Sequence, residues 1–410
     1  MTEEGGVTTA VSPHQGEVES LVRDGRWDAA AVVLRERVRE VPDDASALND
    51  LGVVCHAKGA YEEAEAALDH AHAVEPENLE ILHNLAQASF SLGMFERTLR
   101  LIDAARGLGG GAELEELAVR SRAALDRMTL YPRFVSIETA SVCNARCHFC
   151  ETPNVRRTPF MEEAVWRKIV DDNRTAGVEF RLNMDGEPTL HAQLPDIIAY
   201  IKTTTNCKVT FNTNAERLTP DLGRAILEAG VDGVRFSIDG FRKETFEKHR
   251  IGLNYNVVVA NVLSFLNARE KSKHAAFVEI RMIRFPNNEG ERDAFGLFWS
   301  SFPRVKVILT TPYYWPDIGH DGVARPCFRG EDDFELYYYT DGRATLCCMD
   351  WQEKAVLGDG RKYSTREIWN SPLARSWRKN LREGRRDLIP LCSGCNQDLD
   401  QDAEFELGSK

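Results

Sequence analysis

The chain has 410 residues, long enough for two or three domains with sizeable cores. Its formal net charge of −13 argues against nucleic acid or an anionic membrane as the main partner. No apolar run approaches the roughly 18 residues of a membrane-spanning helix, and the acidic start MTEEGGVTTAVSPHQ has no apolar signal-peptide core. These features predict a cytoplasmic protein. Its ten cysteines should then be reduced, and their clustering indicates metal ligation rather than disulfide bonds.

The first third of the sequence is repetitive, and its period is 34 residues. A glycine followed two residues later by an aromatic recurs at Gly25, Gly59 and Gly93. Small residues let paired helices approach, the aromatic fills the groove between them, and a proline ends the second helix. Residues 11–126 are therefore predicted to be an all-α array that ends in a capping helix over 113–126. The pattern resembles the tetratricopeptide (TPR) family, whose arrays contact a partner, or only stiffen or dimerise an enzyme.

After Tyr131 the pattern changes to short β-branched runs that alternate with amphipathic stretches. This alternation favours parallel strands covered by helices, so 131–310 is predicted to be a partial (β/α)6 barrel within an α/β fold. Active sites of such barrels gather where the strands end. The predicted strands are 134–139, 179–184, 208–213, 233–239, 277–283 and 304–309, with helices between them, for example at 161–176, 219–229 and 256–271.

Three cysteines follow the first predicted strand within the segment SVCNARCHFC. They are Cys143, Cys147 and Cys150. Three thiolates this close are too many for one disulfide and one short of a closed tetrahedral metal site. A zinc knuckle would need a fourth ligand, such as His148. The loop otherwise predicts a metal centre that keeps one position open.

This loop and the segments after the next strands resemble the radical S-adenosylmethionine (SAM) superfamily. The resemblance implies that three thiolates hold three irons of a [4Fe–4S] cluster and that the fourth iron binds SAM. It further implies reductive cleavage of SAM to a 5′-deoxyadenosyl radical, which abstracts hydrogen from an unactivated C–H bond. A flavodoxin- or ferredoxin-type protein would supply the electron. The matching segments are MDGEPTL (184–190), NTNAERL (212–218), SIDG (237–240) and the HR pair at 249–250.

The resemblance also assigns the SAM contacts residue by residue. Asp185 departs from the commonest family pattern, which has glycine there, and this puts the local geometry in question. Asn212 and its neighbour Asn214 could instead cap a turn, and the loop aromatic could simply pack. The implied contacts are Phe149 with adenine, Gly186 and Glu187 with the methionine ammonium, Asn212 with SAM, and Ser237 and Arg250 with the ribose and carboxylate.

A second cysteine set lies in the C-terminal third. Segments DGRATLCCMDW and IWNSPLARSWR make residues 320–398 resemble the twitch domain, an abbreviated relative of the SPASM domain. The resemblance implies one fully ligated auxiliary [4Fe–4S] cluster and thus two clusters in the chain, although four thiolates could also hold zinc. Cys348 falls outside the expected spacing and is treated as a non-ligand; if it were the ligand, Cys347 would be the spare thiol. The implied ligands are Cys327, Cys347, Cys392 and Cys395.

These features predict a radical SAM enzyme that abstracts hydrogen from a secondary carbinol carbon of a carbohydrate natural product. The twitch segment resembles the butirosin-type aminocyclitol dehydrogenases. A TPR array ahead of a radical SAM barrel resembles the orthosomycin (avilamycin-type) epimerases, in which the array would hold a large oligosaccharide or a partner. Epimerisation is therefore favoured over oxidation to a ketone. A peptide-modifying enzyme and a TPR adaptor with a structural cluster are the alternatives.

Epimerisation requires a second hydrogen donor, because hydrogen leaves one face of the carbon and returns to the other. A thiol suits this role. Cys348 is the candidate, since Cys55 lies in the repeats and Cys207 precedes the third strand, at the wrong end of the barrel. Oxidation would instead require a group that takes the hydroxyl proton. The candidates for that group are Glu138, Arg281 and Arg284.

Overall fold

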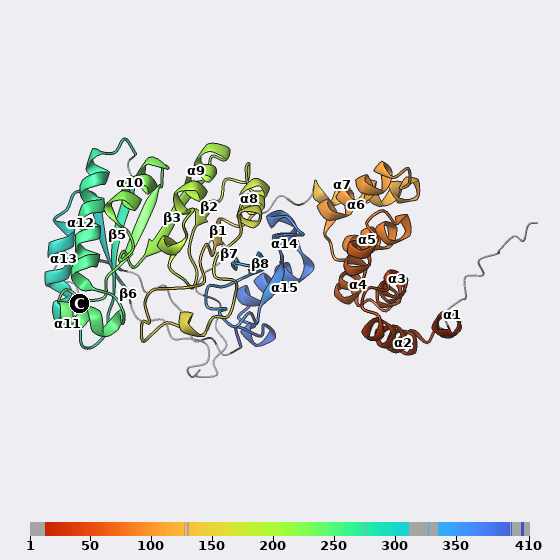
Figure 1. Ribbon diagram of the computed structural model, residues 1–410. Helices are drawn as coiled ribbons and strands as arrows, with labels where there is room; N and C mark the ends of the chain where they lie inside the picture. Colours follow the sequence, from red (N-terminus) through yellow and green to blue (C-terminus); the bar gives the residue numbers. More distant parts are fainter. Residues whose placement is uncertain are drawn as a thin grey trace, which may run out of the picture. The chain divides into compact units, whose positions relative to one another are not determined.

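The chain folds into two compact units, Met1–Thr129 and Leu130–Lys410. The structure is a computed structural model, drawn in Figure 1. It describes residues 13–126, 128, 131–274, 276–310, 327, 335–393, 395 and 403–405. The predicted segment 320–398 therefore includes residues outside the described ranges, and its boundaries stay a prediction.

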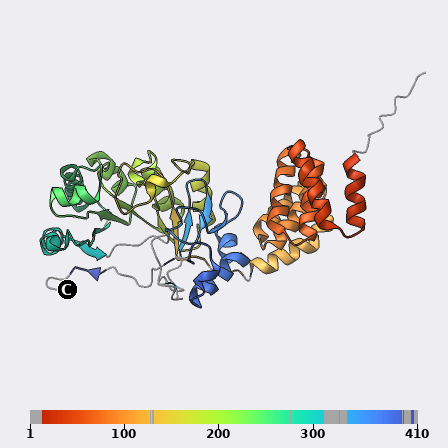
Figure 2. The same ribbon diagram turned by 90° about the horizontal axis from the view of Figure 1, so that it is seen from below.

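The N-terminal unit is an array of helices that pack side by side (Figure 2). The helices α3 and α5 begin 34 residues apart, as do α2, α4 and α6, so the sequence repeat is a structural repeat. Gly25, Gly59 and Gly93 have positive φ angles of 71°, 78° and 78° at the turn within each pair, which favours glycine there. Membership of the TPR family stays a prediction. The elements are α1 (Pro13–Arg23), α2 (Trp27–Glu40), α3 (Ala45–Ala57), α4 (Tyr61–Val74), α5 (Leu79–Ser91), α6 (Phe95–Gly107), η1 (Ala112–Leu114) and α7 (Glu115–Leu125).

Small residues allow the helices of the array to approach closely. A Cβ atom at Gly52 of α3 would lie 2.3 Å from Leu68 Cγ of α4, so any larger residue would separate the pair. Cys55 is fully buried in the same core. It packs there as a small hydrophobic residue.

The C-terminal unit is built on one ten-stranded sheet, and all six predicted strands are present as β1 to β6. Neighbours among these six pair in parallel, in chain order, and the described sheet has open edges, so the barrel is partial. The six strands are β1 (Phe134–Ile137), β2 (Glu179–Arg181), β3 (Lys208–Thr213), β4 (Gly233–Ser237), β5 (Phe277–Ile283) and β6 (Val305–Thr310).

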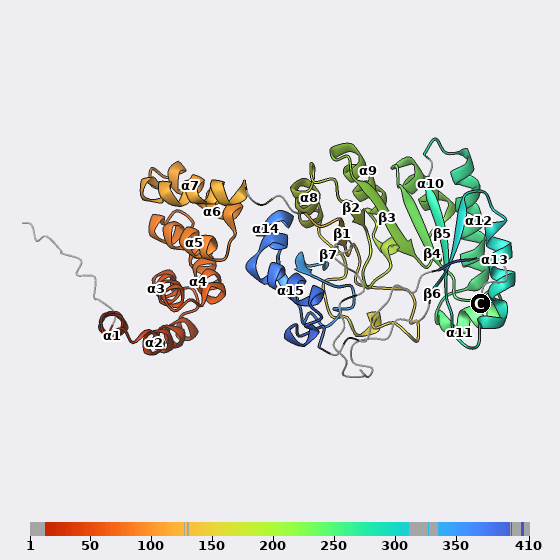
Figure 3. The ribbon, with the colours of Figure 1, turned by 180° about the vertical axis from the view of Figure 1, so that it is seen from behind.

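Amphipathic helices cover the outer face of these strands (Figure 3). The three helices expected at 161–176, 219–229 and 256–271 are confirmed as α8, α10 and α12, although α8 is shorter than expected at both ends. The helices are α8 (Glu163–Asp172), α9 (Leu194–Thr204), α10 (Pro220–Glu228), α11 (Lys243–His249), α12 (Tyr255–Lys271) and α13 (Arg292–Ser300), with η2 (Thr152–Asn154), η3 (Pro188–Leu190) and η4 (Glu289–Glu291).

The C-terminal segment extends the barrel sheet at both edges. Strand β7 pairs in parallel with β1, and β8 and β9 follow it in antiparallel fashion, while β10 pairs antiparallel with β6. Arg181 of β2 donates to Glu335 of β7 at 3.0 Å across β1, which ties this segment to the barrel. The further elements are β7 (Glu335–Tyr338), β8 (Arg343–Thr345), β9 (Val356–Asp359), α14 (Thr365–Asn370), α15 (Pro372–Arg382), η5 (Arg386–Leu388) and β10 (Ala403–Glu404).

No helix in the described parts of the chain combines the length and apolar character that crossing a membrane requires.

Candidate active site

The loop after β1 holds its three cysteine sulfurs among polar neighbours at the carboxyl end of the barrel strands. Burial raises the pKa of Cys143 to about 12 and also raises the pKa of Cys147. A buried thiolate is therefore stable only beside positive charge, which a bound metal centre supplies. The neighbours are Ala145 N at 3.4 Å and Asn214 Nδ2 at 3.8 Å from Cys143 Sγ, Arg250 Nη1 at 3.7 Å from Cys147 Sγ, and Thr152 Oγ1 at 3.0 Å from Cys150 Sγ.

Arg250 links the cysteine loop to the segment after strand β4. Its Nε donates to Asp239 Oδ2 at 2.6 Å, and Asp239 Oδ1 accepts from the backbone N–H of Ile283 at 2.8 Å. The guanidinium carbon lies 5.2 Å from the centre of the Phe149 ring. The structure thus brings Phe149, Cys147 and Arg250 together, three of the residues that the sequence assigns to this site.

Gly186 is required by close packing of backbone against backbone. A Cβ atom there would lie 2.2 Å from Ala140 O and 2.6 Å from Val142 O, both at the start of the cysteine loop. The next backbone N–H, of Glu187, donates to Val142 O at 2.9 Å. The segment after β2 therefore holds the cysteine loop directly. Its contact with the SAM ammonium stays a prediction.

The carboxylate of Glu187 is buried and is fully used inside the protein. It accepts hydrogen bonds from the Thr189 N–H and hydroxyl, from the Thr213 hydroxyl and from the Asn214 N–H. Burial raises its pKa despite these bonds. Glu187 thus joins the loops after β2 and β3, and its backbone is bonded as well, to Val142 O and Leu190 N.

The two asparagines after β3 differ in position. Asn214 is buried, and its Nδ2 donates to Asn144 Oδ1 at 3.0 Å within the cysteine loop. The Asn212 backbone N–H instead donates to Asn183 Oδ1, on the segment after β2, at 3.2 Å. Ser237 is the last residue of β4 and is half-buried. Of the pair, Asn214 is the one that touches the cysteine loop.

An aromatic cluster beside the cysteines is a feature that sequence reasoning missed. His249 stacks on Phe285, with ring centres 4.3 Å apart and an interplanar angle of 12°. His148 Nε2 lies 2.7 Å from His249 Nδ1, and Phe149 lies 5.4 Å from Phe285. His249 belongs to the HR pair of the sequence, but no sequence pattern indicates that Phe285 lies beside it.

A second missed feature is a buried charge cluster centred on Arg157. Its Nε donates to Glu138 Oε2 at 3.1 Å, and its Nη2 donates to Asp185 Oδ2. Burial and the charge of Glu138 raise the pKa of Asp185 to about 7. Asp185 is the residue that departs from the family pattern, and Arg157 compensates part of its charge. Glu138 is inaccessible to solvent and also accepts from Thr340 N at 3.0 Å, so the geometry gives no support to Glu138 as a base.

The Arg157 guanidinium also holds the segment that contains the adjacent residues Cys347 and Cys348. Arg157 Nη1 donates to the Trp351 carbonyl at 3.1 Å and lies 3.4 Å from Glu353 Oε1. The Asp350 N–H donates to the Cys347 carbonyl at 3.2 Å, which closes a turn around Cys348. This turn is therefore held, through Arg157, next to Glu138 and Asp185, which follow β1 and β2.

Three cysteines of the second set, Cys327, Cys392 and Cys395, lie near one another. Burial, together with the nearby Cys395 and Cys327, raises the pKa of Cys392 to about 12. Asp350, which is bonded to the Cys347 backbone, also acts on Cys392. None of the ten cysteines is in a disulfide. In the described parts of the chain, no three His, Cys, Asp or Glu side chains converge on one metal-ion position. A [4Fe–4S] cluster does not need that convergence, because each cysteine binds a separate iron.

Comparison with protein families identifies both cysteine regions. Residues 137–291 match the Radical SAM superfamily, and residues 327–396 match SPASM, an iron-sulfur cluster-binding domain. The chain carries a radical SAM domain. It also carries a SPASM domain, which confirms the resemblance of the C-terminal cysteines to that group.

The curated relatives match about a third of the chain. A GTP 3′,8-cyclase of Chlorobaculum tepidum is 31% identical over 123 residues, which are 30% of this chain and 37% of that protein. An AdoMet-dependent heme synthase of Methanosarcina barkeri is 29% identical over 127 residues, 30% of this chain and 36% of that protein. The chain thus spans about a third of the length of these relatives.

Solved structures are similar to the chain at low identity. BtrN in complex with AdoMet and 2-DOIA is 16% identical, covers 65% of this chain and 94% of that one, and has a TM-score of 0.47. Streptococcus suis SuiB bound to S-adenosylmethionine is 13% identical, covers 73% and 81%, and has a TM-score of 0.49. Identities this low concern the fold alone.

The cofactors predicted from the sequence are those of the two domains, namely SAM and two [4Fe–4S] clusters. The radical SAM domain fits its cluster, because Cys143, Cys147 and Cys150 share one loop and Arg250 lies beside a sulfur. In the SPASM domain, Cys327, Cys392 and Cys395 lie within electrostatic range of one another. The assignment of each ligand stays a prediction.

Proposed function

We propose that this radical SAM protein takes a hydrogen atom from a secondary carbinol carbon of a carbohydrate and epimerises that carbon, with Cys348 returning the hydrogen. The observation that carries the proposal is the anchored turn around Cys348. Arg157 fixes this turn to the ends of β1 and β2 through the Trp351 carbonyl. Cys348 is also among the groups that raise the pKa of Asp185, so the two side chains are within electrostatic range at the barrel mouth.

When bound, the cluster and SAM together supply a radical able to remove hydrogen from an unactivated carbon. The chain's own residues hold and orient these groups. Cys143, Cys147 and Cys150 would hold the cluster, and Arg250, fixed by Asp239, would face the bound SAM. Cys348, which lies on a different segment, would donate its hydrogen to the opposite face of the substrate carbon, and the sulfur radical left behind would regain one electron from the flavodoxin- or ferredoxin-type reductant and a proton from solvent.

The described part of the N-terminal unit is consistent with a large carbohydrate substrate. Peptide-modifying relatives commonly carry a winged-helix domain that binds the leader peptide. Here the described residues of that unit form helices and connecting turns without a strand. A repeating helical array offers an extended surface, which suits a large oligosaccharide or a partner protein.

Oxidation to a ketone is the second candidate, and Asp185 favours it. The reaction needs a group that takes the hydroxyl proton, and a carboxyl with a pKa of about 7 is partly ionised at neutral pH. Arg281 is paired with Glu279 at 3.0 Å, and Glu138 is enclosed. Asp185, whose side chain is 3% exposed and bonded to Arg157, is therefore a further candidate base beside those that the sequence suggests.

The experiment is anaerobic turnover of candidate sugars and oligosaccharides in deuterated water by wild type and by Cys348→Ala. We expect one solvent deuterium on the inverted carbon in wild type, and a stalled reaction or shunt products in the variant. Cys207→Ala is the matched control, because Cys207 is buried beside β3 at the other end of the barrel. A ketone product would favour the second candidate. Continued epimerisation with deuterium uptake by Cys348→Ala would remove the cysteine from the mechanism.

A further inference from the structure

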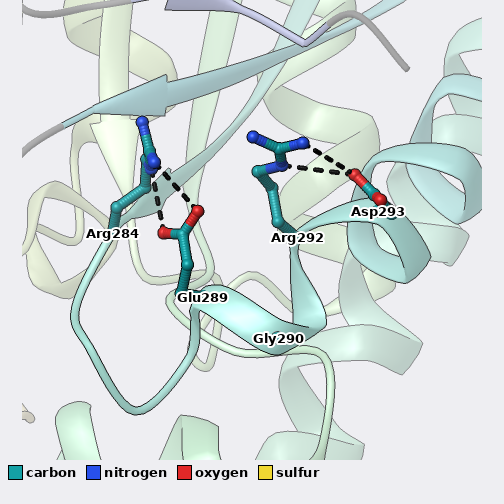
Figure 4. Close-up of a pocket in the computed structure, with 5 residues that line it drawn as sticks. All are labelled: Arg284, Glu289, Gly290, Arg292 and Asp293. Carbon is teal, nitrogen blue, oxygen red and sulfur yellow. Dashed lines mark hydrogen bonds and ion pairs between the residues drawn. The ribbon is translucent and has the colours of Figure 1, made fainter. Parts of the chain in front are cut away.

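A charged pocket lies at the carboxyl end of β5, outside the residues assigned to the cofactors. Its volume is about 370 Å³, within the range of roughly 300–1,000 Å³ that is typical of small-molecule sites. Figure 4 shows two ion pairs side by side, with Gly290 on the chain between them. The lining residues are Arg284, Glu289, Gly290, Arg292 and Asp293.

Each ion pair is neutral as a whole, but its guanidinium and carboxylate groups can still form further hydrogen bonds. Arg284 donates to both oxygens of Glu289, at 3.0 and 2.8 Å, and Arg292 contacts Asp293 Oδ1 through two nitrogens, each at 3.2 Å. A guanidinium has five N–H donors, so three remain on each arginine without a partner among the described residues. The carboxylate oxygens keep spare lone pairs. The hydrogen bond from Arg284, and less strongly the charge of Arg292, lower the pKa of Glu289, so both arginines act on that carboxylate.

This lining discriminates between classes of ligand. An anion such as phosphate would have to displace a carboxylate from its arginine, and the pocket has no net charge to attract it. An apolar ligand would find no apolar side chain in the lining. Hydroxyl groups donate to carboxylates and accept from guanidinium N–H groups, so several of them on one ligand would use both halves of the pocket.

The loop that builds the pocket is fixed to the cofactor site. Asn288 Nδ2 donates to the carbonyls of Asp239 and Ile283, at 3.0 and 2.8 Å. Asp239 in turn holds Arg250, and Phe285 stacks on His249. A ligand in the pocket would therefore lie against a loop that is bonded to residues of the cofactor site.

We infer that this pocket binds a neutral polyhydroxylated group, one sugar unit of the substrate, through the Arg284–Glu289 and Arg292–Asp293 pairs. The inference rests on the proposed function, because it names the site that would hold the carbohydrate. It adds that the recognised group carries no phosphate or carboxylate.

Gly290 offers a direct way to close the pocket. A Cβ atom built there meets nothing within 4 Å, and its φ is outside the left-handed region, so a large side chain fits without backbone strain. Gly290→Phe would occupy the hollow and leave all four charges in place. Asp293→Asn would remove one ion pair and keep the shape.

The test is saturation-transfer NMR on the full-length protein with a panel of neutral di- to tetrasaccharides and, separately, with inorganic phosphate. At least one saccharide should bind to wild type, and phosphate should not. Both variants should weaken that binding about fivefold or more, since hydrogen bonds to charged groups are lost or blocked. The matched control is Asp171→Asn, which breaks the exposed Asp171–Arg174 pair (2.8 Å) at the far end of α8. It should bind like wild type.

The outcomes separate this inference from the function on which it rests. Binding of phosphate in preference to the saccharides, no saccharide binding, or saccharide binding unchanged in Gly290→Phe would overturn the pocket assignment. If a sugar is epimerised or oxidised with an unchanged KM by Gly290→Phe, the proposed function stands and the pocket is not the site. A sugar that binds in the pocket but yields neither product would contradict the proposed function instead.

Discussion

Arg157 donates from Nη2 to Glu138 Oε1 at 2.9 Å, and the two side chains are 1% and 0% exposed. The same nitrogen reaches Asp185, and Nη1 reaches the Trp351 carbonyl. One cation thus faces two buried carboxylates and holds the turn that carries Cys348. A buried charge of this kind is costly to leave unpaired, so the arrangement depends on Arg157.

Arg157→Met should destabilise the C-terminal unit. The substitution keeps most of the side-chain volume but leaves Glu138 and Asp185 without a cation, which typically costs about 3–5 kcal/mol. We expect the free energy of unfolding, measured by urea titration, to fall by about that amount. Arg174→Met is the control, because Arg174 is exposed and pairs only at the surface. A change below about 0.5 kcal/mol in Arg157→Met would show that the buried cluster does not stabilise the fold.

Asp185 should make stability depend on pH. Its pKa is raised to about 7 by burial and by Glu138, with Arg157 opposing and Cys348 adding to the rise. An unfolded aspartate has a pKa of about 3.9, so the folded protein binds this proton more tightly than the unfolded chain. The stabilising contribution is therefore complete below about pH 4 and is lost as the pH rises through 7.

Asp185→Asn tests this sign, because it removes the titrating group. Compared with wild type, the variant should gain about 2.6 kcal/mol of stability between pH 5 and pH 8, measured from the midpoints of denaturant unfolding. When the two free energies of unfolding are subtracted at each pH, the contributions of the other titrating groups cancel. A constant difference, or one that moves the other way, would show that Asp185 is already ionised at pH 5.

Gly186→Ala should disrupt the first cysteine site without touching the second. The new methyl group would overlap the carbonyl oxygens of Ala140 and Val142, so the cysteine loop must move. We expect the iron bound after anaerobic reconstitution to fall by about half, with the auxiliary cluster retained in the EPR spectrum of the reduced protein. Gly290→Ala is the control, because its methyl group meets open space. Full iron content in Gly186→Ala would mean that the close approach is not needed.

Local patterns predicted the parts of this fold that depend on neighbours in sequence. The strands β1 to β6 and the cysteine loop were found because β-branched runs and Cys spacing are short-range signals. Arg157 gave no such signal, since its partners lie 19, 28 and 194 residues away. Only the folded chain brings them together.

The sequence also did not predict the pairing of strands that are far apart along the chain. Strand β7 pairs with β1 although about 200 residues separate Phe134 from its partner Glu335. Neither segment has a sequence pattern that indicates the pairing. The choice between Asn212 and Asn214 was equally open, because alternate residues at the end of a strand share a face. In the fold Asn214 contacts the cysteine loop and Asn212 contacts Asn183, while the assignment of Asn212 to SAM stays a prediction.

The N-terminal unit should be dispensable for SAM cleavage. It is compact and ends at Thr129. A protein beginning at residue 130 should therefore still form 5′-deoxyadenosine from SAM, while its KM for the substrate rises. Product analysis by chromatography at several substrate concentrations separates the two effects. An unchanged KM would reduce the helical array to a structural appendage.

The most direct measurement is the iron content and SAM cleavage of the anaerobically reconstituted protein, with the triple variant Cys143→Ala, Cys147→Ala and Cys150→Ala beside it. Wild type should hold about eight irons and form 5′-deoxyadenosine in the presence of a strong reductant. The triple variant should hold about four irons and form none. About four irons in wild type, zinc at the second site, or 5′-deoxyadenosine from the triple variant would contradict a radical SAM enzyme with two clusters.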